Sequence, residues 1–222
     1  MKLRLKKSVS STEKTKVLYP PRPNNKILPS QIHTYDPNNW VAQRKFNGSR
    51  TVVNIKGDKV SFLNYGEPHK NWKPSQSIID QFLSLNLKKD KEYWFDGELL
   101  YSKTKDPFYK NKIVLFDILQ EGNYFFNSLN LMERYDLLKE VCRFPKELES
   151  KNKLALVVTE DIWLVEMFED NFEKHFKEYL HLDEIEGLVL KKRNSVLNNA
   201  GNKKYSVSWQ VRCRKPHKNY TF

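Results

Sequence analysis

Residues 40 to 50 read Trp-Val-Ala-Gln-Arg-Lys-Phe-Asn-Gly-Ser-Arg, an apolar stretch that runs into a short basic segment. The pattern places Lys45 at the end of an expected strand, close to Gly48 and Arg50. Gly48 can adopt a positive φ and lets a phosphate or nucleoside approach the backbone, and the Arg50 guanidinium offers several donors to anionic oxygens. We therefore take Lys45 as the candidate nucleophile. A basic surface turn is the alternative, and it is the commoner meaning of such a segment standing alone.

Four further segments strengthen this interpretation because they follow in a fixed order: Phe95-Asp96-Gly97-Glu98, Leu115-Phe116-Asp117-Ile118-Leu119, Glu186-Gly187-Leu188-Val189-Leu190-Lys191, and Trp209 to Lys215. Together with the lysine segment they resemble the nucleotidyltransferase motifs of ATP-dependent DNA ligases, RNA ligases and mRNA capping enzymes. The resemblance covers residues 40 to 215. The stretch from Gly122 to Leu138 is also similar to the helix after the third motif in DNA ligases.

The chain has 222 residues, of which 13% are aromatic, enough for one large domain or a domain with a small appendage. Its net charge of +12 is uneven, since residues 1 to 26 carry eight Lys/Arg and one acid, and residues 191 to 222 carry nine and no acid. Basic ends favour a polyanion partner, because neutralising phosphates releases counterions. A solubilising tail is the alternative. The candidate nucleic-acid contacts are Lys2, Arg4, Lys6, Lys7, Lys192 and Arg193.

Several classes of protein are disfavoured. Cys142 and Cys213 are too few and too far apart for a disulfide framework or a zinc site, and the five histidines show no metal-ligand spacing. No apolar run approaches the ~20 residues that span a bilayer, and the charged N-terminus has no signal-peptide core behind it. We expect a monomer without a membrane partner, located in the cytoplasm or acting as a viral protein in the host cytoplasm.

Periodicity predicts the organisation of the chain. The proline-rich segment 19–25 indicates that residues 1–39 form an extended basic arm lying on the domain, and residues 40–222 form the catalytic domain. Strands are expected between residues 40 and 63, with a hairpin turn at 56–58, and at 93–95, 113–119, 187–190 and 205–213; helices are expected over 74–87, 131–141 and 163–179. The fold class is α+β, with two packed antiparallel sheets and flanking helices. The resemblance implies a nucleotidyltransferase (ATP-grasp-like) ligase core.

The resemblance also implies roles for individual residues. Lys45 would form a lysyl-AMP, and Arg50 would contact the sugar or the 5′-phosphate. Glu98 would bind the ribose or help to hold a metal, since a carboxylate suits both. Phe116 would stack on adenine, although it could equally belong to the core.

The later motifs would complete the site. Glu186 would be a metal-site carboxylate for Mg²⁺ (or Mn²⁺), and Lys191 would contact the α-phosphate of ATP. A lysine amine attacks phosphorus only when unprotonated, and desolvation, cations and bound Mg²⁺ nearby favour that form. The remaining expected nucleotide ligands are Gln43, Arg44, Arg212 and Arg214.

The sequence departs from the family pattern in several places. Asn47 stands where an aspartate is usual, so no role that needs a carboxylate is expected there. Gln43 replaces an adenine-facing glutamate, and Asn64 replaces an arginine. Arg212 and Arg214 replace the two lysines of the last motif, and arginine can still clamp phosphate through paired donors.

The resemblance implies an ATP-dependent DNA ligase that seals nicked duplexes through a lysyl-AMP and a 5′-adenylated strand. Only seven residues follow Lys215, so no OB-fold domain of the kind that follows this core in DNA ligases and capping enzymes is expected. A minimal ligase, a fragment and a protein working with another subunit all remain open. So do an RNA ligase acting on nicked RNA, a capping guanylyltransferase and a non-catalytic nucleic-acid-binding module.

Overall fold

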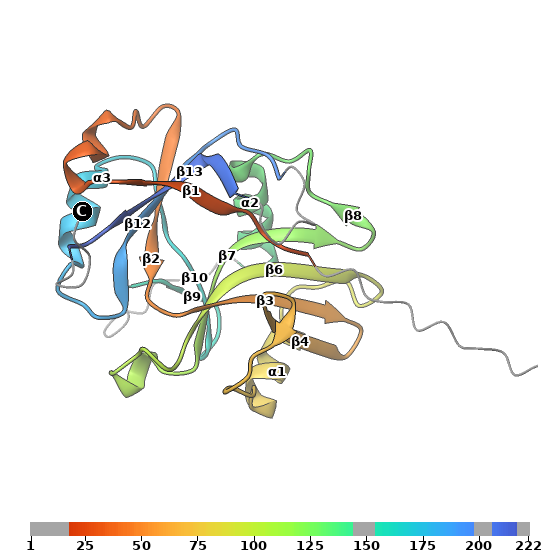
Figure 1. The fold of residues 1–222 in the computed structure, drawn as a ribbon. Coiled ribbons are helices and arrows are strands. Elements are labelled where there is room, and N and C mark those ends of the chain that lie inside the picture. The colour runs from red at the N-terminus through yellow and green to blue at the C-terminus, as the bar shows by residue number, and fades with distance from the viewer. Residues whose placement is uncertain (1–17, 144–153, 198–205, 217–222) are drawn as a thin grey trace, which may run out of the picture.

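The computed structural model describes residues 18–143, 154–197 and 206–216, and its strands form two sheets (Figure 1). The smaller sheet has five strands in the order β1 (Arg22–Ile27), β13 (Ser206–Arg214), β12 (Ile185–Lys192), β2 (Trp40–Phe46) and β11 (Met167–Phe168). The larger sheet has eight strands, in the order β5 (Glu67–Pro68), β4 (Lys59–Asn64), β3 (Ser49–Lys56), β6 (Glu92–Leu100), β7 (Lys112–Glu121), β10 (Ile162–Leu164) and β9 (Leu156–Val157), with β8 (Tyr124–Phe125) paired to β7.

Each sheet buries one face against helices. Helices α1 (Gln76–Leu83) and α2 (Leu131–Val141) pack on the larger sheet and complete the main core. Helix α3 (Phe172–Glu178) and the 3₁₀ helix η1 (Pro29–Thr34) cover the smaller sheet, where a second apolar cluster forms around Ala42, Leu188 and Val211. A further 3₁₀ turn, η2 (Pro107–Tyr109), precedes β7.

Side chains alternate along the strands that carry the expected motifs. On β2, Ala42 packs into the apolar cluster while Gln43 and Lys45 line a pocket on the other face. On β13, Val211 and Cys213 are buried, while Arg212 and Arg214 line the same pocket. Because the side-chain period of a strand is two, one register places these apolar groups in the core and these polar groups at the pocket.

The chain passes from one sheet to the other at Asn47 and Gly48, between β2 and β3. The Asn47 amide donates to the carbonyl of Glu184, and its side chain donates to the carbonyl of Asp183. A Cβ on Gly48 would lie 2.4 Å from the carbonyl oxygen of Leu99 and 2.7 Å from Cγ of Glu98. This crossing therefore requires glycine because strand β6 approaches its backbone closely.

The expected α+β class with two sheets is confirmed, with two corrections. The pairs β1–β13 and β7–β10 are parallel, so the sheets are mixed rather than purely antiparallel. The helix expected over 163–179 is wrong over its first half, because Trp163 pairs with Val114 in β10 and Phe168 pairs with Ala42 in β11. Only the part from Phe172 to Glu178 is helical.

The expected arm also needs correction. Strand β1 pairs with β13 from Arg22 opposite Ser206 to Ile27 opposite Cys213, and Ile32 of η1 is buried in the smaller sheet's cluster. These residues are therefore part of the domain rather than an arm preceding residue 40, and residues 1–17 lie outside the described part. Within the described residues, no helix is long and apolar enough to span a membrane.

Candidate active site

A pocket of about 380 Å³ lies between strands of the two sheets. All ten residues expected to bind nucleotide or metal line it, namely Gln43, Arg44, Lys45, Arg50, Glu98, Phe116, Glu186, Lys191, Arg212 and Arg214. They come from β2, β3, β6, β7, β12 and β13, and thus from segments as far apart as residues 43 and 214. The structure therefore brings the separate sequence motifs into one site.

Lys45 and Glu186 form an ion pair at this site. Lys45 Nζ lies 2.6 Å from Glu186 Oε2, and Arg214 Nε lies 3.1 Å from the same oxygen. Burial alone would raise the pKa of Glu186, but Lys45 and then Arg214 outweigh it and hold that pKa below its ordinary value. Glu186 is thus a carboxylate beside the candidate nucleophile.

The glycine after Glu186 permits this arrangement. Gly187 has a φ of +141°, and a Cβ there would lie 2.0 Å from the carbonyl oxygen of Cys213. Gly187 lies opposite both Lys45 on β2 and Arg214 on β13, beside an irregularity in the pairing of β12 with β2. Close approach of three backbones therefore places Glu186 between its two cationic partners.

Glu98 lies beside the lysine loop and accepts a hydrogen bond of 3.2 Å from the backbone amide of Gly48. Burial raises the pKa of Glu98 to about 7, although Lys45 and Arg50 both act in the opposite direction. The nearby carboxylate of Glu186 adds to the increase.

Lys191 is buried in the same pocket. Burial lowers its pKa to about 8, although the carboxylates of Asp117 and Asp96 partly oppose this effect. Its Nζ lies 5.5 Å from the centre of the Phe116 ring, and Cζ of Arg50 lies 5.8 Å from the same centre. Phe116 is half-buried, so it packs on the main core and also presents surface to the pocket.

Asp96 was not expected to be a functional residue. Its carboxylate accepts hydrogen bonds from Nε of Arg50, at 2.8 Å, and from Nη2. Arg50 Nη2 also donates to the carbonyl of Pro21 at 3.2 Å. Asp96 lies two residues before Glu98 on β6, and this spacing could have placed both carboxylates on one face of the strand.

Asp117 was missed as well. It pairs with the fully buried Arg134 of α2, with Nε–Oδ1 at 2.8 Å and Nη2–Oδ2 at 3.0 Å. Arg134 also donates to the carbonyls of Leu129 and Ser195. Asp117 follows Phe116 in the sequence and lines the pocket, so this buried pair joins α2 to the pocket wall.

The expected role of Arg44 needs correction. Its Nη1 donates to the carbonyl of Leu154 at 2.9 Å and lies 2.8 Å from Oε2 of Glu166. Its guanidinium also lies over the rings of Phe168 and Tyr179. These contacts occupy the side chain, so only the backbone of Arg44 is left to contact a nucleotide.

The expected nucleic-acid contacts are not gathered at the pocket. Arg193 pairs with Glu169 at 2.8 Å and donates to the carbonyl of Pro37, and Lys192 lies 5.7 Å from the ring centre of Trp40. Neither lines the pocket. Lys2, Arg4, Lys6 and Lys7 lie outside the described residues.

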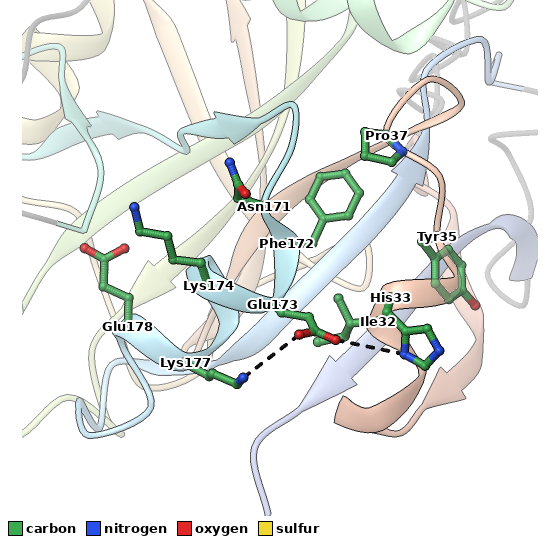
Figure 2. Close-up of a pocket in the computed structure, with 10 residues that line it drawn as sticks. All are labelled: Ile32, His33, Tyr35, Pro37, Asn171, Phe172, Glu173, Lys174, Lys177 and Glu178. Atoms are coloured by element: carbon green, nitrogen blue, oxygen red, sulfur yellow. Dashed lines mark ion pairs between the residues drawn. The ribbon is translucent and has the colours of Figure 1, made fainter.

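A second hollow, of about 750 Å³, lies between η1 and α3 (Figure 2). Figure 2 shows Glu173 between His33 and Lys177, at 3.9 Å and 4.0 Å respectively. None of the residues expected to bind nucleotide or metal lines it. We therefore place the chemistry in the smaller pocket, where titratable groups from distant motifs converge.

The donors of the smaller pocket fit a magnesium ion. Mg²⁺ is usually held by one or two carboxylates together with substrate phosphates. Glu98 and Glu186 are close enough for their charges to interact, and a divalent cation would relieve that repulsion. Within the described residues, no group of three or more His, Cys, Asp or Glu side chains forms a metal cluster of its own.

Comparisons with known proteins agree with this geometry. No protein-family model matches the sequence, and no curated protein sequence matches it. Mycobacterial DNA ligase D complexed with ATP has the same fold, with a TM-score of 0.63 at 15% identity over 89% of this chain and 60% of that one. The ligase domain of LigD from M. tuberculosis has a TM-score of 0.61 at 14% identity over 87% and 58%. The ATP-dependent DNA ligase from bacteriophage T7, complexed with ATP, has a TM-score of 0.54 at 13% identity over 88% and 68%.

The chain therefore has the fold of the ligase domains of ATP-dependent DNA ligases. It spans about 60% of the length of the first of these structures.

Proposed function

We propose that this protein is an ATP-dependent polynucleotide ligase that acts on nicked DNA through a covalent Lys45–AMP intermediate. The observation that carries the proposal is the 2.6 Å contact between Lys45 Nζ and the Glu186 carboxylate, in a pocket that Lys191 and Arg212 also line. This contact holds the amine among the side chains expected to bind phosphate, and the cations around it favour the unprotonated amine that attacks.

In the first step, Lys45 Nζ would attack the α-phosphorus of ATP. The new N–P bond forms while the bond from that phosphorus to the bridging oxygen breaks, so pyrophosphate leaves and the amine proton passes to solvent. Lys191 and Arg212 would bind the phosphate oxygens, and Phe116 would stack on adenine. A bound Mg²⁺, held by Glu98, Glu186 and phosphate oxygens, would stabilise the charge that develops on the phosphates.

In the later steps, AMP would pass from Lys45 to a 5′-phosphate, and a 3′-hydroxyl would then displace it. The solved structures named above are DNA ligases, which favours DNA over RNA as the nicked strand. An RNA ligase with the same chemistry is the alternative, and nicked RNA duplexes belong in the same assay.

The test is the intact mass of the protein after incubation with Mg²⁺ and either ATP, GTP or NAD. We expect an added AMP with ATP, and its loss in Lys45→Ala. Lys59→Ala is the matched control, because this exposed lysine starts strand β4 and does not line the pocket. Equal labelling of Lys45→Ala would show that the nucleophile is another residue.

A further inference from the structure

A segment that precedes the lysine motif lines the pocket. Leu18 is buried with Val52 and Trp94 of the larger sheet. Three residues on, the carbonyl of Pro21 accepts hydrogen bonds from Arg50 Nη2, at 3.2 Å, and from Gln210 Nε2, at 3.0 Å. Arg50 lies on β3 of the larger sheet and Gln210 on β13 of the smaller one, so this segment is bound to both sheets at the site.

The next residue, Arg22, lines the pocket. Its Cζ lies 4.1 Å from the centre of the Tyr65 ring, in the turn between β4 and β5. Tyr65 has a φ of +54° and is 54% exposed, and a Cβ on the following Gly66 would lie 2.2 Å from the Tyr19 hydroxyl. The N-terminal segment and this turn are therefore in close contact beside the Arg22–Tyr65 pair.

The charge of Arg22 is available for a ligand. Arg50 has Asp96 and Arg214 has Glu186 as carboxylate partners, whereas no carboxylate of the described residues forms an ion pair with Arg22. Stacking holds the planar guanidinium in place but leaves its N–H groups in the plane, where they can donate in pairs to phosphate oxygens. Arg22 lines the pocket with no carboxylate partner among the described residues, so its guanidinium can bind a phosphate there.

We propose that Arg22, oriented by Tyr65, is a further phosphate-binding residue of this pocket. The proposal rests on the proposed function for the source of the phosphate, which is either the ATP polyphosphate or the 5′-phosphate of the strand to be joined. A polynucleotide end and a free nucleotide offer the same chemistry, and separate measurements distinguish them.

The experiment compares Arg22→Gln and Tyr65→Leu with the wild-type protein. Lys26→Gln is the matched control, because it removes the same charge from an exposed position on the same strand, outside the pocket. Two affinities are measured without requiring any reaction, one for ATP and one for a nicked duplex with either a 5′-phosphate or a 5′-hydroxyl. The rate of nucleotide addition to Lys45 is followed by mass, and thermal melting reports the fold of each variant.

We expect Arg22→Gln to weaken one of these interactions by about tenfold, the usual scale for a charge-assisted hydrogen bond. Weaker ATP binding would assign the phosphate to the nucleotide, and loss of the preference for a 5′-phosphate would assign it to the strand. Tyr65→Leu should give a smaller loss of the same kind and leaves β1 unchanged, so it serves if Arg22→Gln melts early.

Affinities of both variants equal to those of Lys26→Gln would overturn the proposal, whether or not Lys45 is labelled. If wild-type protein takes no nucleotide on Lys45 but binds ATP or a 5′-phosphate through Arg22, the proposed function fails and this inference stands.

Discussion

The burial of Glu98 in the pocket lowers the stability of the folded protein at neutral pH. Burial raises its pKa to about 7, from an ordinary value of 4.5. Between these two values the unfolded chain has already released the proton while the folded chain still holds it. The free energy of unfolding therefore falls as pH rises from about 4.5 to about 7, and the full cost persists at higher pH.

Glu98→Gln should remove this cost. We expect the variant to be more stable than the wild type by about 1 to 3 kcal/mol at pH 8, and the difference to disappear near pH 4. The amide oxygen can still accept from Gly48, but it cannot balance a metal charge, so nucleotide addition to Lys45 should fall by about 100-fold. Urea denaturation at both pH values measures the stability difference, and the labelling rate measures the loss of nucleotide addition. A variant less stable than the wild type at pH 8 would contradict the prediction.

Single residues were predictable where a short motif carries chemistry. Lys45, Glu98, Glu186 and Lys191 each lie in such a motif, and the structure gathers all four. Arg44 lies in the same motif, but it is adjacent to Lys45 on a strand, so its side chain points to the opposite face. The expected role did not take this alternation into account.

Contacts between residues far apart in the sequence could not be predicted. The contact of Asp117 with Arg134 depends on how α2 packs on β7, and no local spacing reveals it.

Strand β12 is the element on which the site depends most, because it lies between β2 and β13 and carries both Glu186 and Lys191. Gly187→Ala should destabilise the protein by about 3 kcal/mol or more, since it adds a severe clash with Cys213 to an unfavourable φ. Gly57→Ala is the control, because Gly57 has a φ of +59° and a Cβ there would meet no atom within 4 Å, so it should cost only about 1 kcal/mol. Denaturant midpoints compare the two, and equal losses would mean that β13 can yield at Gly187.

Whole elements were predicted best where one period runs without interruption. Helix α2 has the expected bounds, Leu131 to Val141. The segment from Trp163 to Tyr179 was predicted wrongly as one helix because its apolar residues have helical spacing. In the structure these residues belong to β10, β11 and α3 in turn. Strand β1 was missed because Pro20, Pro21 and Pro23 argue against a central strand, whereas β1 lies at a sheet edge, where proline is tolerated.

The uneven charge of the chain predicts that different residues bind the nicked duplex and the nucleotide. Residues 1–16 contain Lys2, Arg4, Lys6, Lys7, Lys14 and Lys16, and they precede every residue expected to bind the nucleotide, the first of which is Gln43. Deleting them should lower the slope of log affinity for nicked duplex against log salt, by about 0.9 for each phosphate that the shortened protein no longer neutralises.

Labelling of Lys45 in this truncated protein should stay almost unchanged, because the truncation keeps every residue expected to bind the nucleotide. Affinities at several salt concentrations, measured beside labelling rates, test both statements. An unchanged slope with slower labelling would mean that these residues support the catalytic domain instead of binding the duplex.

The pairing of β1 with β13 also bears on how the protein is made. A ribosome releases Arg22–Ile27 long before Ser206–Arg214, yet each is a sheet neighbour of the other. During translation β1 must wait for β13, and until then the edge that will pair with β13 is open to unwanted pairing, because domains complete such distant contacts only when both partners have emerged. A chain that stops short of residue 206 would lack Arg212, Arg214 and the neighbour of β1 together, so nascent fragments should carry neither a finished smaller sheet nor a working site.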